Sequence, residues 1–317
     1  MTNPLVERIQ KIAASGAIVC DLGDLEFSEL PEQIASLRKI ELLALGWNIP
    51  AVQNNRVTWA SDYKRPYRRK PLSLSAIQSL SNLRALDLAG WEIDLASLDV
   101  IAKLKRLSHL QTRLPHGATL SFLNSLPDLS TLSLSGIGTN DLTPLGSLRN
   151  LRRLEISGDG LKSLEALSEL AGVRKISIDG GQVSDYRPLR NMKELRSAFL
   201  RSDSHKSLDG FQGLSKLESL SAVDGGIQNL APLTGLKQLR ELAFQYCSEL
   251  SDLSAVATMP SLCSLSLENC YRISDWSPLL KCENLEVLRL NSCSPRNLGV
   301  LSRHPRVQII REGEPPG

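Results

Sequence analysis

Leucine and other apolar residues recur along the chain in the pattern L-x-x-L-x-L. Clear copies are LRRLEI (151–156), LRELAF (239–244) and LEVLRL (285–290). The second apolar residue marks each copy, and these markers stand 22 or 23 residues apart at Leu110, Leu132, Leu154, Ile176, Ala198, Leu220, Leu242, Leu265, Leu288 and Ile310. The register continues more loosely upstream through Leu86, Leu43 and Cys20, so the sequence predicts about thirteen similar structural units.

Each unit combines two kinds of local pattern. The L-x-L segment alternates apolar and polar positions, which is typical of a short β-strand with one buried face. The other half of the unit often contains a proline, as in DLTPLGSLRNL (141–151) and DWSPLLKCENL (275–285). Proline is tolerated in the first turn of a helix, so short helical turns are expected at Pro144, Pro188, Pro232 and Pro278.

These copies resemble the repeats of leucine-rich repeat proteins, in particular the short 22-residue class seen in internalins and in a protein phosphatase regulatory subunit. The resemblance implies an α/β solenoid, a horseshoe of about 13 coils. Its parallel β-sheet would form the concave face, with short helical or 3-10 turns on the convex face. The composition agrees, because 59 of the 317 residues are leucine and only 4% are aromatic. Such coils bury their apolar faces by stacking on their neighbours.

The repeat also suggests where the domains begin and end. Residues 1–16 are predicted to form an N-terminal capping helix, since residues 4–15 carry an apolar stripe and Gly16 follows them. Residues 17–310 form the solenoid, and 311–317 are expected to be a flexible tail.

One segment, at about 49–76, interrupts the repeat and replaces or enlarges one coil. It places Trp59, Tyr63 and Tyr67 beside basic residues. One interpretation is a loop that contacts phosphate or an acidic partner, and the other is a solvated loop whose aromatic residues pack against the solenoid. The residues of the candidate loop contact are Lys64, Arg65, Tyr67, Arg68 and Arg69.

Cysteines recur at the ends of the last predicted strands. Cys247, Cys270 and Cys293 are 23 residues apart, which resembles the cysteine-containing repeat of F-box-type leucine-rich proteins. That resemblance implies small buried side chains stacked in a ladder. A zinc site needs thiolates that converge on one ion, and a ladder without a C-x-x-C pair does not offer this. We therefore expect no metal.

The net charge and the sequence motifs limit the classes of function that this protein can have. The formal net charge of +3 is too balanced for a binder of nucleic acid, and no apolar run approaches the length of a membrane span. The N-terminus lacks the layout of a signal peptide, so a cytoplasmic protein with reduced thiols is expected. No phosphate-binding loop, H-E-x-x-H or G-x-S-x-G motif is present. The sequence predicts no enzyme and no cofactor.

The working surface is expected on the concave face, at the outward positions of the strands. These positions are small and nearly neutral, with nine serines among twenty-seven residues. Phe199 is a candidate aromatic anchor, although Ala198 in the marker position leaves open a local bulge that turns Phe199 inward. The candidate partner-binding residues are Arg113, Arg153, Glu155, Lys175, Asp179, Phe199, Arg201, Asp203, Asp224, Glu241, Gln245, Tyr246, Glu268 and Arg289.

The resemblance implies a noncatalytic protein-protein recognition scaffold that binds a protein partner on its concave face. A narrower version is an inhibitor or immunity protein, since the ribonuclease inhibitor has the same architecture. The alternative is a sensor or regulatory subunit of a multi-protein complex in bacterial defence or signalling. The expected partner is a protein, with nucleic acid and membrane disfavoured, and the chain is expected to be a monomer or one subunit of a hetero-complex.

Overall fold

The structure is a computed structural model, and it describes the chain except for residues 1–2, 54–55, 62–70, 181, 294–296 and 313–317. Within the described residues, thirteen parallel strands follow one another in sequence order, and β3 and β4 form a separate two-stranded sheet. The chain divides into two compact units, residues 1–156 (unit 1) and 157–317 (unit 2).

Unit 1 begins with helix α1 (Pro4–Ser15), which starts after Asn3 and ends where Gly16 adopts a left-handed backbone conformation. Its parallel strands are β1 (Val19–Asp21), β2 (Leu42–Ala44), β5 (Ala85–Glu92), β6 (His109–Arg113), β7 (Thr131–Ser135) and β8 (Arg153–Ser157). The other sides of the coils hold η1 (Glu32–Ser36), η2 (Ser75–Ile77), α2 (Ala96–Lys103), η3 (Ser121–Ser125) and α3 (Thr143–Gly146).

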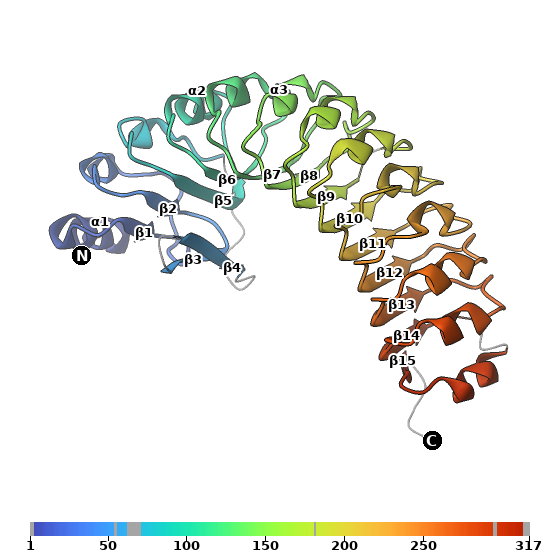
Figure 1. Cartoon of the computed structure of the whole chain (residues 1–317). Helices are drawn as coiled ribbons and strands as arrows, with labels where there is room; N and C mark the ends of the chain where they lie inside the picture. Colours follow the sequence, from blue (N-terminus) through green and yellow to red (C-terminus); the bar gives the residue numbers. More distant parts are fainter. Residues whose placement is uncertain (1–2, 54–55, 62–70, 181, 294–296, 313–317) are drawn as a thin grey trace. The chain divides into compact units, whose positions relative to one another are not determined.

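Unit 2 is more regular, with one five-residue strand in each coil. Its strands are β9 (Lys175–Asp179), β10 (Ser197–Arg201), β11 (Ser219–Val223), β12 (Glu241–Gln245), β13 (Ser264–Glu268), β14 (Val287–Asn291) and β15 (Gln308–Glu312). Figure 1 shows the strands along one side of these coils and 3-10 helices along the other. The helices are η4 (Glu165–Glu169), η5 (Arg187–Asn191), η6 (Asp209–Phe211), η7 (Ala231–Leu233), η8 (Ser254–Thr258), η9 (Ser277–Lys281) and η10 (Leu298–Arg303).

The strand register confirms the sequence markers from Cys20 to Leu154 in unit 1 and from Ile176 to Leu288 in unit 2. The last marker is wrong by one residue, because Leu288 pairs with Ile309 and Ile310 pairs with Arg289. The final coil is therefore shorter than the repeat predicts. The strand β15 also extends to Glu312, past the expected boundary at residue 310.

The expected proline positions are confirmed. Pro144, Pro188, Pro232 and Pro278 each stand in the first turn of a short helix. In those positions the missing N–H removes no helical hydrogen bond. The buried side chains of the coils are mostly leucines at the two apolar positions of each strand and on the helical side.

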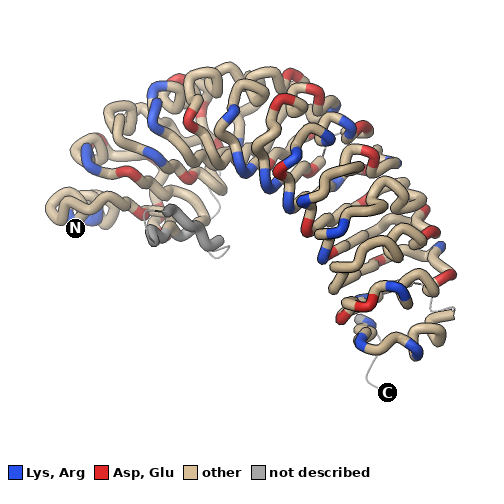
Figure 2. Tube along the Cα trace, viewed as in Figure 1, with Lys and Arg blue, Asp and Glu red and all other residues tan. Residues whose placement is uncertain are grey.

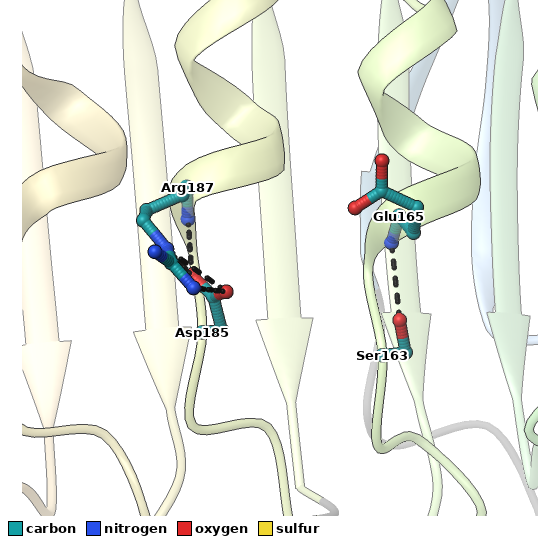
Figure 3. A network of polar contacts seen from close by, with 4 residues as sticks. All are labelled: Ser163, Glu165, Asp185 and Arg187. Atoms are coloured by element: carbon teal, nitrogen blue, oxygen red, sulfur yellow. Dashed lines mark hydrogen bonds and ion pairs between the residues drawn. The ribbon is translucent and has the colours of Figure 1, made fainter.

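A second repeated feature, a side-chain cap, precedes these turns, and the sequence analysis did not identify it. Two residues before the turn, a Ser, Asp or Asn side chain accepts a hydrogen bond from the backbone N–H at the start of the turn. In Figure 3, Ser163 Oγ accepts from Glu165 N at 3.3 Å and Asp185 Oδ1 accepts from Arg187 N at 2.8 Å. The Arg187 guanidinium also holds the Asp185 carboxylate, which lowers the pKa of Asp185. The same bond recurs at Ser207, Asn229, Asp252 and Asp275. Each such bond satisfies an otherwise unpaired N–H at a helix start.

The interruption enlarges one coil and does not replace one, since β2 pairs directly with β5. Its described residues up to Ser61 form an antiparallel hairpin of β3 (Asn48–Gln53) and β4 (Arg56–Ser61), where a loop was expected. Residues 71–76, which the prediction included in the interruption, belong to the coil instead, with Leu72 and Leu74 buried. The candidate loop contacts Lys64, Arg65, Tyr67, Arg68 and Arg69 lie outside the described residues.

Candidate recognition surface

The outward-facing residues of β9 to β14 form one continuous array, which we call the strand face of unit 2. Parallel pairing aligns the strands in register, with Phe199 between Ser177 and Ser221 and Arg201 between Asp179 and Val223. Neighbouring strands in a sheet lie about 4.8 Å apart, so side chains on adjacent strands contact one another. The alternation that buries the apolar residues thus presents the polar ones on the opposite face.

Phe199 points outward and is partly exposed, while Ala198 is 2% exposed and aligned with the buried Ile176 and Leu220. The alternative in which a bulge turns Phe199 inward is therefore wrong. The alanine occupies the ordinary core position without changing the register.

Phe199 belongs to a small cluster with two charged residues. The guanidinium carbon of Arg201 lies 5.7 Å from the Phe199 ring centre, within the range of a cation–π contact. Arg201 Nη1 also lies 3.1 Å from Asp179 Oδ2. The cluster presents an aromatic ring whose neighbouring cation is already oriented by a carboxylate.

The remaining acidic residues of the strand face are less constrained. Within the described part of the chain, Glu241 and Glu268 make no ion pair, and neither do the exposed cations Lys175 and Arg289. Gln245 stands between Val223 and Glu268 in register. These groups are available to charges on a partner.

Val223 departs from the expected pattern of outward positions. It is 4% exposed, although it is aligned with Arg201 and Gln245. The strand face is therefore less uniform at this edge than the alternation predicts.

The turns after the strands form the edge of this face. Asp224, Tyr246, Asn269 and Ser292 stand at equivalent positions and all have positive φ. The backbone N–H of Tyr246 donates to Glu268 O at 2.9 Å, and that of Asp224 donates to Gln245 O at 3.0 Å. Tyr246 is 52% exposed, and Asp203, in the turn after β10, is exposed as well.

Tyr271 is a further exposed aromatic residue on this edge that the sequence analysis missed. It is 57% exposed, and its hydroxyl donates to Asn269 Oδ1 at 2.5 Å. Tyr271 directly follows Cys270, and the cysteine repeat predicts a turn at that position. The outward strand positions alone do not include it.

The candidate residues of unit 1 form ion pairs within the unit. Arg153 Nη2 lies 2.6 Å from Glu155 Oε1, and Arg113 Nε lies 3.7 Å from Glu92 Oε1. Figure 2 shows residues of both signs distributed along the coils of each unit. The charge pattern agrees with the near-neutral composition.

In unit 1, the root of the hairpin occupies part of the outward strand surface. Asn48 Nδ2 donates to Asp87 Oδ1 at 3.0 Å and to Gln111 Oε1 at 2.8 Å. Asp87 also accepts from the backbone N–H groups of Asn48 and Ala89. Asp87 is 1% exposed, so its carboxylate is buried under the start of β3. This set of polar residues attaches the hairpin to β5 and β6.

Two histidines have a lowered pKa for the same main reason. Burial lowers the pKa of His109, and the charge of Arg84 lowers it further. His205 has no exposed surface, and burial lowers its pKa, opposed by the Ser202 backbone and by the carboxylates of Asp224 and Asp203. Among the described residues, no three His, Cys, Asp or Glu side chains are placed to hold a metal ion. No helix in this part of the chain has the length and apolar character of a membrane span.

The coils, their parallel register and the 3-10 turns define a leucine-rich repeat fold of the short, internalin-like class, with cysteine-containing repeats near the C-terminus. The fold is similar to that of an internalin from Listeria monocytogenes, with a TM-score of 0.70, 17% identity, and 98% of this chain and 95% of that chain covered. It is also similar to a leucine-rich repeat protein of Leptospira interrogans, with a TM-score of 0.54, 17% identity, and 91% and 82% covered. No protein-family model matches the chain, and no curated protein matches it.

Proposed function

We propose that the protein is a noncatalytic scaffold that recognises a protein partner through the strand face of unit 2. The observation that carries this proposal is Phe199, an outward aromatic residue with the Arg201 guanidinium over its ring, on a face otherwise rich in serine. Aromatic residues and arginine are enriched among the residues that dominate protein interfaces. The exposed Tyr246 adds a second aromatic anchor at the edge of the same face.

The charges of the face favour a protein over a nucleic acid. Lys175, Arg201 and Arg289 are spread over the strand face together with Asp179, Glu241 and Glu268. A nucleic-acid backbone selects clustered cations, and Arg201 is already paired with Asp179. Alternating signs are instead suited to orienting a protein partner.

Two biological roles fit this surface, and fold alone does not choose between them. The first is an inhibitor or immunity protein that binds one target at equal stoichiometry. The second is a sensor or regulatory subunit whose output depends on a separate effector, and it is favoured if the partner contacts the hairpin of unit 1 as well. We further propose a cytoplasmic location, which fractionation of the native cell would test.

Site-specific photo-crosslinking tests the proposal. A photoreactive phenylalanine analogue in place of Phe199 should crosslink to a protein in the native lysate. The same analogue in place of Lys193, an exposed residue after η5 on the helical side, is the matched control. A partner captured from position 199 and not from 193 supports recognition by the strand face. Equal capture, or capture from 193 alone, would contradict it.

A further inference from the structure

Three thiols occupy equivalent places at the ends of β12, β13 and β14. Each sulfur lies near two carbonyls, one two residues earlier in its own coil and one in the preceding coil. For Cys270 these are Glu268 O at 3.4 Å and Phe244 O at 3.6 Å, and for Cys293 they are Asn291 O and Leu267 O, both at 3.4 Å. Cys247 has the same arrangement with Gln245 O and Ala222 O. The repeated geometry stacks the three side chains in one row.

Cys270 and Cys293 are direct neighbours in this row. The strands that precede them pair in register, with Glu268 opposite Asn291, and Asn269 N donates to Asn291 O at 2.9 Å between the two turns. The two side chains therefore lie next to each other in the row, and each thiol donates to backbone carbonyls. Adjacent strands are about 4.8 Å apart, which lies within the Cα separation of about 4.4–6.8 Å that a disulfide spans.

The two thiols differ in their surroundings. Cys270 is buried, while Cys293 is partly exposed. The neighbouring Cys270 thiol lowers the pKa of Cys293, while the Cys293 thiol and burial raise the pKa of Cys270. Cys293 is therefore the thiol that a peroxide in solvent reaches, with Cys270 buried beside it. This is the arrangement of an attacking and a resolving thiol.

We propose that Cys293 and Cys270 form a peroxide-reactive thiol pair that closes to a disulfide between two successive coils. The Cys293 thiolate attacks one oxygen of hydrogen peroxide, the O–O bond breaks, and hydroxide leaves, which yields a sulfenic acid. The Cys270 sulfur then attacks the Cys293 sulfur, its proton is lost, and the sulfenic oxygen departs as water. One peroxide is reduced to water as two thiols become one disulfide.

The structure offers a matched control in Cys263. Its thiol is also partly exposed, but it donates to Arg240 O at 3.4 Å and has no thiol neighbour in the described residues. The fully reduced full-length chain is treated with hydrogen peroxide at neutral pH and digested, and the cysteine peptides are identified by mass spectrometry. We expect a peptide that joins Cys270 to Cys293. When the reduced chain is alkylated, Cys293 should react about tenfold faster than Cys263.

Two variants separate the steps. In Cys270→Ser the Cys293 sulfenic acid has no resolving thiol, so it should accumulate and be trapped by dimedone. Cys247→Ser should leave the 270–293 disulfide unchanged. The proposal is overturned if Cys293 and Cys263 react at equal rates, if no 270–293 peptide forms, or if the disulfide forms instead between Cys247 and Cys270.

Discussion

At the scale of single residues, His205 of unit 2 is a tightly confined polar side chain. It is completely buried, and among the described residues neither ring nitrogen has a well-formed hydrogen-bond partner. The Tyr186 ring meets the imidazole edge-on, with 5.6 Å between the ring centres. A Cβ on Gly225 would lie 2.4 Å from His205 Nε2, so glycine is required beside it. His205 is thus held as a neutral imidazole in the core.

This burial predicts a pH dependence of stability. The pKa of an unfolded histidine is about 6.5, and the folded value is lower, so the unfolded chain binds the additional proton as pH falls below about 6.5. Above that pH, His205 should therefore contribute no pH dependence to the free energy of unfolding. Below it, stability should fall by up to about 1.4 kcal/mol per pH unit until the folded pKa is reached.

Denaturant unfolding of the wild type and of His205→Leu between pH 7.5 and 5 measures this effect. The variant should lose the part of this dependence that comes from His205 and keep the part that comes from the lowered pKa of His109. His116→Gln, at an exposed histidine, should retain both parts. If His205→Leu keeps the slope of the wild type, the burial of a neutral histidine is not its cause.

At the scale of elements, the repeat made most of the fold predictable. The period gave the strand positions, and the prolines gave the turns, because both follow from local patterns of burial. The hairpin was missed although VQNNRVTW holds two β-prone runs around Asn54-Asn55, since the nearby cluster of basic residues favoured a loop. The error at Ile310 has a similar origin, because VQII offers two adjacent isoleucines and the average period selected the wrong one.

The root of the hairpin gives a prediction for unit 1. Asp87→Ala removes the acceptor of three N–H groups, from Asn48 Nδ2, Asn48 N and Ala89 N. Buried donors that lose their partner cost about 1–3 kcal/mol each when water does not replace it, so a loss of about 2–3 kcal/mol in total is expected. Hydrogen exchange in β3 should also become faster.

Asp128→Ala is the control, because Asp128 is exposed and makes no ion pair within the described residues. It should change the free energy of unfolding by less than about 0.5 kcal/mol. Equal effects of the two substitutions on stability and on β3 exchange would show that Asp87 does not hold the hairpin.

At the scale of the whole molecule, the candidate site was only partly predictable. The alternation placed Phe199 and Arg201 on the outward face, and the structure agrees. It did not foresee that Val223 is buried, that Arg153 and Glu155 pair with each other, or that Tyr271 extends the edge. These properties depend on side-chain lengths in adjacent coils, which the repeat pattern of one coil does not contain.

The central claim is that the strand face of unit 2 binds a protein. The most direct measurement is the dissociation constant of the crosslinked partner for the wild type, Phe199→Ala, Tyr246→Ala and the control Lys193→Ala, with the unfolding midpoint of each chain measured alongside. We predict that each aromatic substitution weakens binding by about tenfold or more, which is about 1.4 kcal/mol, while Lys193→Ala changes it less than about twofold. Unchanged affinity in both aromatic variants, with folding intact, would contradict the account and place the binding surface elsewhere.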